Sequence, residues 1–160
     1  MELTIEQALQ QGVVAHQGGK LKEAERLYRA VLQLQPLHPE ANHNLGVLVI
    51  SFGKVEVALP FFKTALDVNP DVEQFWYSYI NALIKGQHRE RAEEIAKKGR
   101  HYGLSGPDID LLDGKIVQKL GKLDDAETNL RRAITLKPEF AAVHNILGLV
   151  FKDLGRKSFF

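Results

Sequence analysis

A spacing of 34 residues runs through this chain. Alanine recurs at Ala24, Ala58, Ala92 and Ala126, with no insertion between these positions. Three further columns keep the same register: Gly12, Gly46, Gly114 and Gly148; Gly19, Gly53, Gly121 and Gly155; Pro36, Pro70 and Pro138. A fixed period of this length is typical of helical-repeat arrays, in which each repeat buries its apolar face only against its neighbours. We therefore predict a repeat array that covers essentially the whole chain.

Each unit divides into two helical segments separated by a short turn. In the second unit, apolar residues at helical spacing occupy residues 39–52 and 55–68, with Gly53 between them. Glycine readily adopts the left-handed conformation that often ends a helix, and a proline such as Pro70 cannot continue the second helix. The pattern predicts a helix-turn-helix unit. The Thr4–Gln7 segment also predicts a capping box at the start of the first helix.

A glycine in the middle of a helix needs a physical reason, because it costs about 0.5–1 kcal/mol relative to alanine. Gly46 is such a residue, and Ala58 lies in the second helix of the same unit. We expect the two small residues to let the helix backbones approach closely, while Phe62 and other large side chains fill the surrounding space. In the third unit Ile80 replaces the glycine and Ala96 replaces the large residue. This exchange predicts a local repacking that conserves volume.

The small residues at the eighth and twentieth positions of the units, the large residue at the twenty-fourth and the proline at the thirty-second resemble the tetratricopeptide repeat. Trp76 and Tyr79 lie where that family often has tryptophan and a large apolar residue. The resemblance implies an all-α fold, a right-handed α-solenoid of helix-turn-helix repeats in a single array over residues 1–160. The repeats would span residues 5–38, 39–72, 73–106 and 107–140, followed by a first helix at 141–154. Residues 100–106, with two glycines and Leu104 in place of proline, predict a looser turn.

The resemblance also implies that the first helices line a concave groove, the surface that such folds use for binding. The candidate peptide-binding residues of this groove are His43, Asn44, Val47, Tyr77, Ser78, Asn81, Lys115 and Gln118. The amides of Asn44 and Asn81 each offer a donor and an acceptor to the main chain of an extended peptide, while Tyr77 and Val47 hold an apolar side chain. The alternative interpretation is that these polar side chains are only solvated.

Some tetratricopeptide domains bind the acidic carboxyl terminus of heat-shock chaperones with a clamp of lysine, arginine and asparagine. At the positions of that clamp this chain has Leu9, Val13, Gln74 and Ser78, and only Asn44 matches. Since the cations that would neutralise a terminal carboxylate are missing, we do not expect a receptor for chaperone tails.

Charge and composition argue against several other functions. The chain has 21 Lys and Arg against 20 Asp and Glu, no cysteine, and six histidines without a pair four residues apart. No catalytic constellation or phosphate-binding loop is present, and Trp76 is expected in the core rather than stacked on bases. We therefore expect no enzyme activity, cofactor, metal ion, nucleic acid or membrane. The acids Glu2 and Glu6 near the amino end are unlike the basic start of an export signal, and a cytoplasmic location is expected.

The last helix, residues 141–154, has no second helix after it. Its apolar residues are Val143, Ile146, Leu147, Val150, Phe151 and Leu154. We expect one face to pack on the fourth repeat and another to remain open, which predicts a homodimer through this helix. The alternative is that neighbouring cations keep the end solvated and that the helix frays.

Two functions are consistent with these features. The first is a scaffold that binds a protein or peptide segment in the groove. The second is a targeting or oligomerisation module of a multidomain enzyme, because the regular period and the segment Asn44-Leu45-Gly46 are similar to arrays joined to glycosyltransferases.

Overall fold

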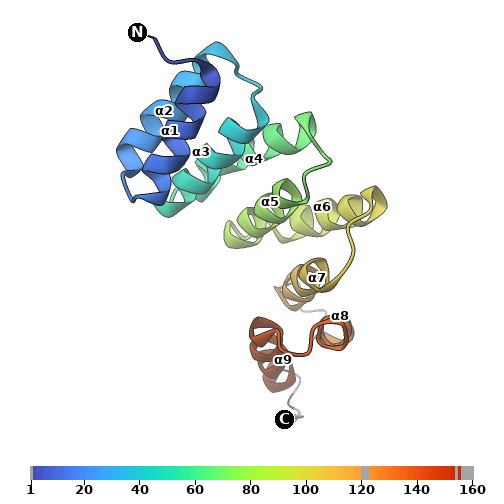
Figure 1. Ribbon diagram of the computed structural model, residues 1–160. Coiled ribbons are helices and arrows are strands. Elements are labelled where there is room, and N and C mark those ends of the chain that lie inside the picture. Colours follow the sequence, from blue (N-terminus) through green and yellow to red (C-terminus); the bar gives the residue numbers. More distant parts are fainter. Residues whose placement is uncertain (1, 120–122, 154, 156–160) are drawn as a thin grey trace. The chain divides into compact units, whose positions relative to one another are not determined.

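The computed structural model describes residues 2–119, 123–153 and 155. Within these residues the fold is all-α and contains no strand (Figure 1). The helices are α1 (Ile5–Gln17), α2 (Leu21–Leu34), α3 (Pro39–Ser51), α4 (Val55–Val68), α5 (Glu73–Lys85), α6 (Arg89–Tyr102), α7 (Pro107–Lys119), α8 (Leu123–Leu136) and α9 (Ala141–Asp153). None of the described helices is both long enough and apolar enough to cross a membrane.

The helix ends agree with the signals in the sequence. The Thr4 hydroxyl accepts a hydrogen bond from the Gln7 amide, and the Gln7 side chain accepts one from the Thr4 amide, which confirms the capping box. Gly19 and Gly53 have φ values of 77° and 75° in the turns after α1 and α3. These values lie in the left-handed region that glycine tolerates best. Gly121, in the corresponding turn after α7, lies outside the described residues.

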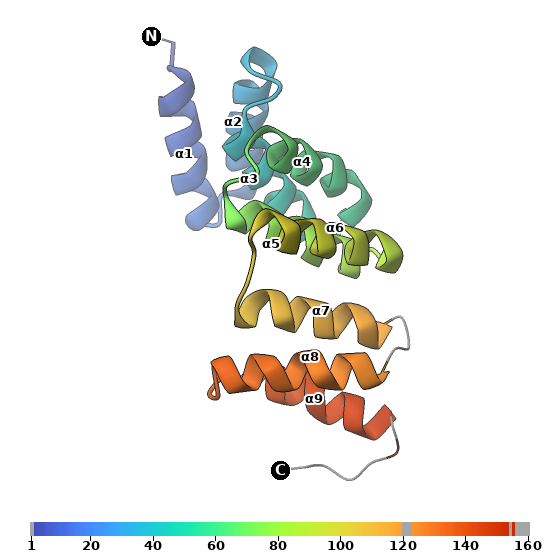
Figure 2. The same ribbon diagram turned by 90° about the vertical axis from the view of Figure 1, so that its right-hand side faces the viewer.

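The chain forms two compact units, residues 1–82 and 83–160, and α5 crosses the boundary between them. In the first unit α1 pairs with α2, α3 pairs with α4, and α2 packs on α3 (Figure 1). In the second unit α6 packs on α7, and α9 contacts both α8 and α7. Figure 2 shows α8 side by side with α7 and with α9. The turn predicted within residues 100–106 occupies residues 103–106, because α6 continues to Tyr102, and both Gly103 and Gly106 have positive φ. It has the same length as the turns before α3 and α5.

The alanine column lies at the centre of the packing. Ala24, Ala58, Ala92 and Ala126 are all 0% exposed, whereas Ala30, outside the column, is half-buried. Each alanine of the column lies in the second helix of its repeat, in closely packed surroundings that leave no room for a larger side chain. The complete burial of this column agrees with its predicted place between packed helices, and the cost of a larger side chain there stays a prediction.

The expected role of the glycine column was wrong in one respect. A methyl group on Gly46 would lie 2.9 Å from Cε1 of Phe62, and one on Gly114 would lie 2.6 Å from Cγ of Leu130. The glycine therefore makes room for a large side chain of the second helix, rather than for close approach of two backbones. Gly148 has the same position in α9, and a methyl group there would meet nothing within 4 Å among the described residues.

The fourth residue of three first helices ties its helix to the turn before it. The side chains of Asn42, Trp76 and His144 each hydrogen-bond the carbonyl of the proline six residues earlier, at 3.0, 2.8 and 2.7 Å. Trp76 is only 6% exposed, so its predicted place in the core is confirmed. The repeated contact fixes the direction in which each first helix leaves its turn.

The apolar face expected to remain open on α9 is largely covered. Val143, Leu147, Val150 and Phe151 are at most 3% exposed and form a core cluster with residues of α7 and α8. The sequence pattern cannot show that α9 turns this stripe inward onto both helices. Leu149, 53% exposed, is the large apolar side chain of α9 that stays open, and Leu154 lies outside the described residues. The homodimer stays a prediction, without the open face on which it was based.

Candidate functional site on the open face of α3 and α5

One face of α3 is buried and the opposite face is open. Ala41, Leu45, Leu48 and Val49 are at most 2% exposed. The residues between them on the helix wheel are the exposed or half-buried Glu40, His43, Asn44, Val47, Ile50 and Ser51. Their spacing of three and four residues places them on one stripe of the helix.

The part of α5 within the first unit is divided in the same way. Phe75, Trp76, Tyr79 and Ile80 are at most 6% exposed. The open stripe consists of the exposed or half-buried Gln74, Tyr77, Ser78 and Asn81. Both open stripes therefore carry mainly neutral polar side chains, with Val47 as an apolar residue that is 38% exposed.

His43 joins the two stripes. Its Nε2 lies 2.8 Å from the Ser78 hydroxyl, and its Nδ1 lies 3.3 Å from Oδ1 of Asn44. The imidazole ring rests on the rings of Phe75 and Phe62, with centroid distances of 4.9 and 5.7 Å. The polar contact between α3 and α5 therefore lies directly on buried aromatic side chains, which hold the imidazole in place.

The charge state of His43 decides which partner donates in its hydrogen bonds to Asn44 and Ser78. Burial lowers the pKa of His43, and it outweighs the hydrogen bond to Asn44 and the charge of Glu40, which both act in the opposite direction. A neutral ring with its proton on Nδ1 donates to Asn44 and accepts at Nε2 from the Ser78 hydroxyl. The Ser78 oxygen in turn accepts from Gln74 Nε2 at 3.1 Å. The network is satisfied when every member is neutral.

Two amide groups on this face keep capacity for a further partner. The oxygen of Asn44 contacts His43, while its Nδ2 donates to none of the residues that the structure describes. Asn81 shows the reverse arrangement, because its Nδ2 donates to the Tyr77 carbonyl at 3.0 Å and its oxygen accepts no described hydrogen bond. One side chain therefore offers a donor and the other an acceptor.

The eight predicted site residues divide between the two units. His43, Asn44, Val47, Tyr77, Ser78 and Asn81 belong to the open stripes of the first unit. Lys115 and Gln118 lie on α7 in the second unit, where both are half-buried. Binding of a peptide by these residues stays a prediction.

A charged cluster in the second unit was not predicted. Arg100 of α6 donates from Nη2 to Asp110 at 2.5 Å and from Nε to Asp113 at 2.6 Å, both on α7. Arg132 of α8 lies 3.5 Å from the same oxygen of Asp110. Because Asp110 is only 2% exposed, the two guanidinium groups compensate a buried carboxylate.

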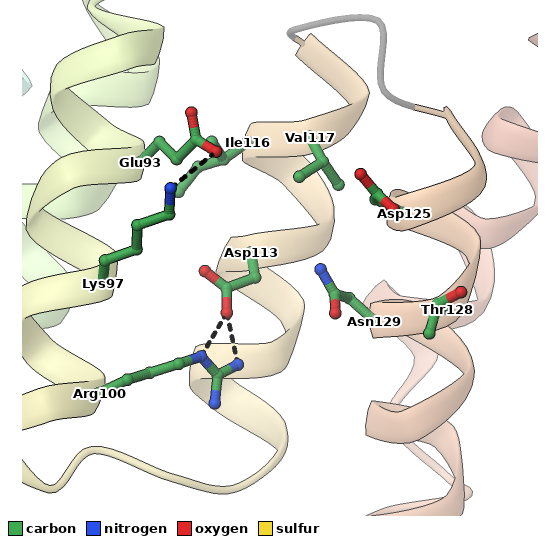
Figure 3. Close-up of a pocket in the computed structure, with 9 residues that line it drawn as sticks. All are labelled: Glu93, Lys97, Arg100, Asp113, Ile116, Val117, Asp125, Thr128 and Asn129. Carbon is green, nitrogen blue, oxygen red and sulfur yellow. Dashed lines mark hydrogen bonds and ion pairs between the residues drawn. The ribbon is translucent and has the colours of Figure 1, made fainter.

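The cluster borders a surface pocket of about 330 Å³. In Figure 3 its lining side chains come from α6, α7 and α8, and both Nε and Nη2 of Arg100 contact one oxygen of Asp113. Burial raises the pKa of Asp113 and the nearby Asp110 charge adds to this, although Arg100 opposes both. Lys97 pairs with Glu93 along α6, at one side of the same pocket, at 3.5 Å.

The repeat columns contain a signal for this cluster. Arg100 stands in the column of Leu66, and Asp113 stands in the column of Leu45, both of which are buried in the second repeat. At these two positions, buried leucines of the second repeat are replaced by an arginine in the third repeat and an aspartate in the fourth, and the two charges have opposite sign. Asp110 stands in the column of Asn42 but has no amide to donate to the preceding turn, and it pairs with arginine instead.

Among the described residues, α6 carries a row of ion pairs on its solvent-facing side. Lys97 pairs with Glu93, Lys98 with Glu94 at 3.1 Å, and Arg91 lies 3.9 Å from Glu94. These side chains are mostly solvated, so the pairs contribute little to stability. In the described part of the chain, no three His, Cys, Asp or Glu side chains are grouped so that they could hold a metal ion.

Comparison with known proteins gives matches to one kind of repeat. A family model described as tetratricopeptide repeat matches residues 9–73, and a second model described as TPR repeat matches residues 114–155. The TPR repeat-containing protein YpiA of Bacillus subtilis (strain 168) is 22% identical over 136 residues. That alignment covers 84% of this chain but only 32% of YpiA, so the chain spans about a third of the length of this relative.

Solved structures of helical-repeat proteins are similar over nearly the whole chain. A crystal structure of MamA superposes with a TM-score of 0.83 at 19% identity, covering 94% of this chain and 82% of MamA. A tetratricopeptide repeat protein from Parabacteroides merdae ATCC 43184 has a TM-score of 0.85 at 20% identity, covering 95% and 59%. YrrB, described as a TPR protein with an unusual peptide-binding site, has a TM-score of 0.80 at 15% identity, covering 96% and 79%. These similarities confirm the fold class of an all-α helical-repeat solenoid.

Proposed function

This chain belongs to the tetratricopeptide repeat family, and we propose that it is a protein-interaction scaffold that binds an extended peptide segment on the open face of α3 and α5. The observation that carries the proposal is the pair of amides on this face. Asn44 offers an unused donor and Asn81 an unused acceptor, and these are the two groups that pair with a peptide main chain. YrrB supports peptide binding as a use of this fold.

The face is held in place before any partner arrives. The contact between His43 and Ser78 joins α3 to α5, and the rings of Phe75 and Phe62 fix the imidazole. Because these side chains are already ordered, a bound segment loses less conformational entropy on their account. Val47, 38% exposed beside the network, is a contact for an apolar side chain of the partner.

A random-peptide selection on the immobilised chain, followed by fluorescence anisotropy of the selected peptides, tests this function. We expect a variant with both Asn44→Ala and Asn81→Ala to bind the selected peptides roughly 5- to 100-fold more weakly, since each lost hydrogen bond contributes about 0.5–1.5 kcal/mol. Both amides are partly or fully solvated, so the helical circular dichroism should not change.

The matched control removes two exposed amides at the end of α2, one in its last turn and one directly after it. A variant with Gln33→Ala and Gln35→Ala should bind the selected peptides as the unaltered chain does. The proposal is refuted if the α2 variant loses binding while the variant of Asn44 and Asn81 retains it, or if the selection returns no peptide.

A further inference from the structure

The cations of the first unit are segregated from its open face. Within the first unit, the described residues of α1, α3 and α5 include no lysine or arginine, whereas Glu6, Glu40 and Glu73 lie on these helices. The lysines and arginines of the unit's helices are exposed on α2 and α4: Lys22, Arg26, Arg29 and Lys63. Within the first unit, Glu40 is therefore the charged side chain among the described residues of the open stripes, and Lys85 lies on α5 one turn beyond Asn81, in the second unit.

Glu40 is the charge closest to the polar network on this face. It lies three residues before His43, so the two side chains share the open stripe of α3. Its carboxylate forms no ion pair with any residue that the structure describes. Burial raises the pKa of Tyr28 on α2, and the charge of Glu40 adds to the shift.

His43 does not neutralise this acid. Its two ring nitrogens are occupied by Asn44 and Ser78, and the ring packs on two phenylalanines. A cation at this position would lose hydration against the aromatic rings. The negative charge on the open face consequently has no fixed counter-charge in the first unit among the described residues.

We propose that the segment bound on the open face of α3 and α5 carries a lysine or arginine that pairs with Glu40, and that acidic side chains are excluded there. This inference rests on the proposed function and adds the chemical class of the partner. Opposite charges across an interface favour the encounter, and like charges placed together oppose it. The amides of Asn44 and Asn81 then hold the main chain, while Glu40 selects the side chain.

The same peptide selection tests the charge of the partner. Peptides that need Asn44 and Asn81 should be enriched in lysine and arginine and depleted in aspartate and glutamate. Glu40→Gln should weaken binding of a selected basic peptide by about two- to five-fold, as expected for a solvated ion pair, and the preference should diminish as the salt concentration rises. Glu40→Lys should weaken it further and favour the acidic version of the same peptide.

Glu23→Gln on α2 is the matched control, because it removes an exposed acid of the same unit from outside this face. It should leave binding unchanged. Selected peptides that depend on the two asparagines but are rich in acidic residues would overturn the inference and leave the scaffold function standing. Equal affinity of the unaltered chain and Glu40→Gln for a basic peptide would overturn it as well. Retention of full binding by the variant with Asn44→Ala and Asn81→Ala would instead overturn the proposed function.

Discussion

The glycine column allows a sharp test of packing because two of its members differ in their surroundings. A methyl group added by Gly46→Ala would lie 2.9 to 3.1 Å from three ring atoms of Phe62, which is itself 1% exposed. The same change at Gly148 meets nothing within 4 Å in the described part of the chain. The two substitutions therefore share the change in helix propensity and differ in the contact.

Helix propensity and side-chain packing contribute separately to the change in the free energy of unfolding. Replacing glycine by alanine inside a helix stabilises it by about 0.5–1 kcal/mol, so Gly148→Ala should raise the free energy of unfolding by that amount. Gly46→Ala has the same gain in helix propensity but adds an overpacking cost of about 1–3 kcal/mol, because the buried ring of Phe62 would have to shift. We expect Gly46→Ala to be destabilising, and the two variants to differ by about 1–3 kcal/mol.

Urea unfolding followed by helical circular dichroism measures the overall change, and native-state hydrogen exchange in α3 and α9 assigns it to the altered helix. Adding Phe62→Leu to Gly46→Ala should cost less than the sum of the two single changes, since the smaller side chain relieves the contact. If Gly46→Ala and Gly148→Ala changed stability by the same amount and sign, the packing role of the glycine would be refuted.

Three further predictions concern stability. Arg100→Ala leaves the 2% exposed Asp110 with weaker compensation, so it should lower the free energy of unfolding by about 2–4 kcal/mol; an unchanged urea midpoint would contradict this. His43 has a lowered pKa when folded, so its contribution is fully present above its unfolded pKa of about 6.5 and is lost as the pH falls below that value. His43→Gln should remove this part of the pH dependence. If the free energy of unfolding of His43→Gln and of the unaltered chain changed with pH in parallel, this contribution of His43 would be contradicted. Ala58→Leu should cost about 1–3 kcal/mol and Ala30→Leu less, as compared by thermal unfolding; equal midpoints would mean that the packing register is wrong.

The helices and their ends could be predicted from the sequence because local rules control them. The 34-residue columns place a fully buried alanine in each hairpin, Ala58 in the second, and Gly53 at the turn adopts the expected positive φ. Capping, turn chemistry and helical spacing act over a few residues, so they can be read without knowing the tertiary structure. The resemblance to the tetratricopeptide repeat predicted which residues of α3 and α5 occupy the open face.

The partners of individual side chains were decided only by the tertiary structure. His43 and Ser78 are 35 residues apart, and Arg100 meets Asp113 across two helices. The sequence predicted that His43 and Ser78 face the same side but not that they form a hydrogen bond. Hydrogen bonds and ion pairs need atoms within about 3 Å, and only the packing of helices brings distant residues to that separation. For the same reason the glycine column showed that space was needed, while the structure showed which side chain fills it.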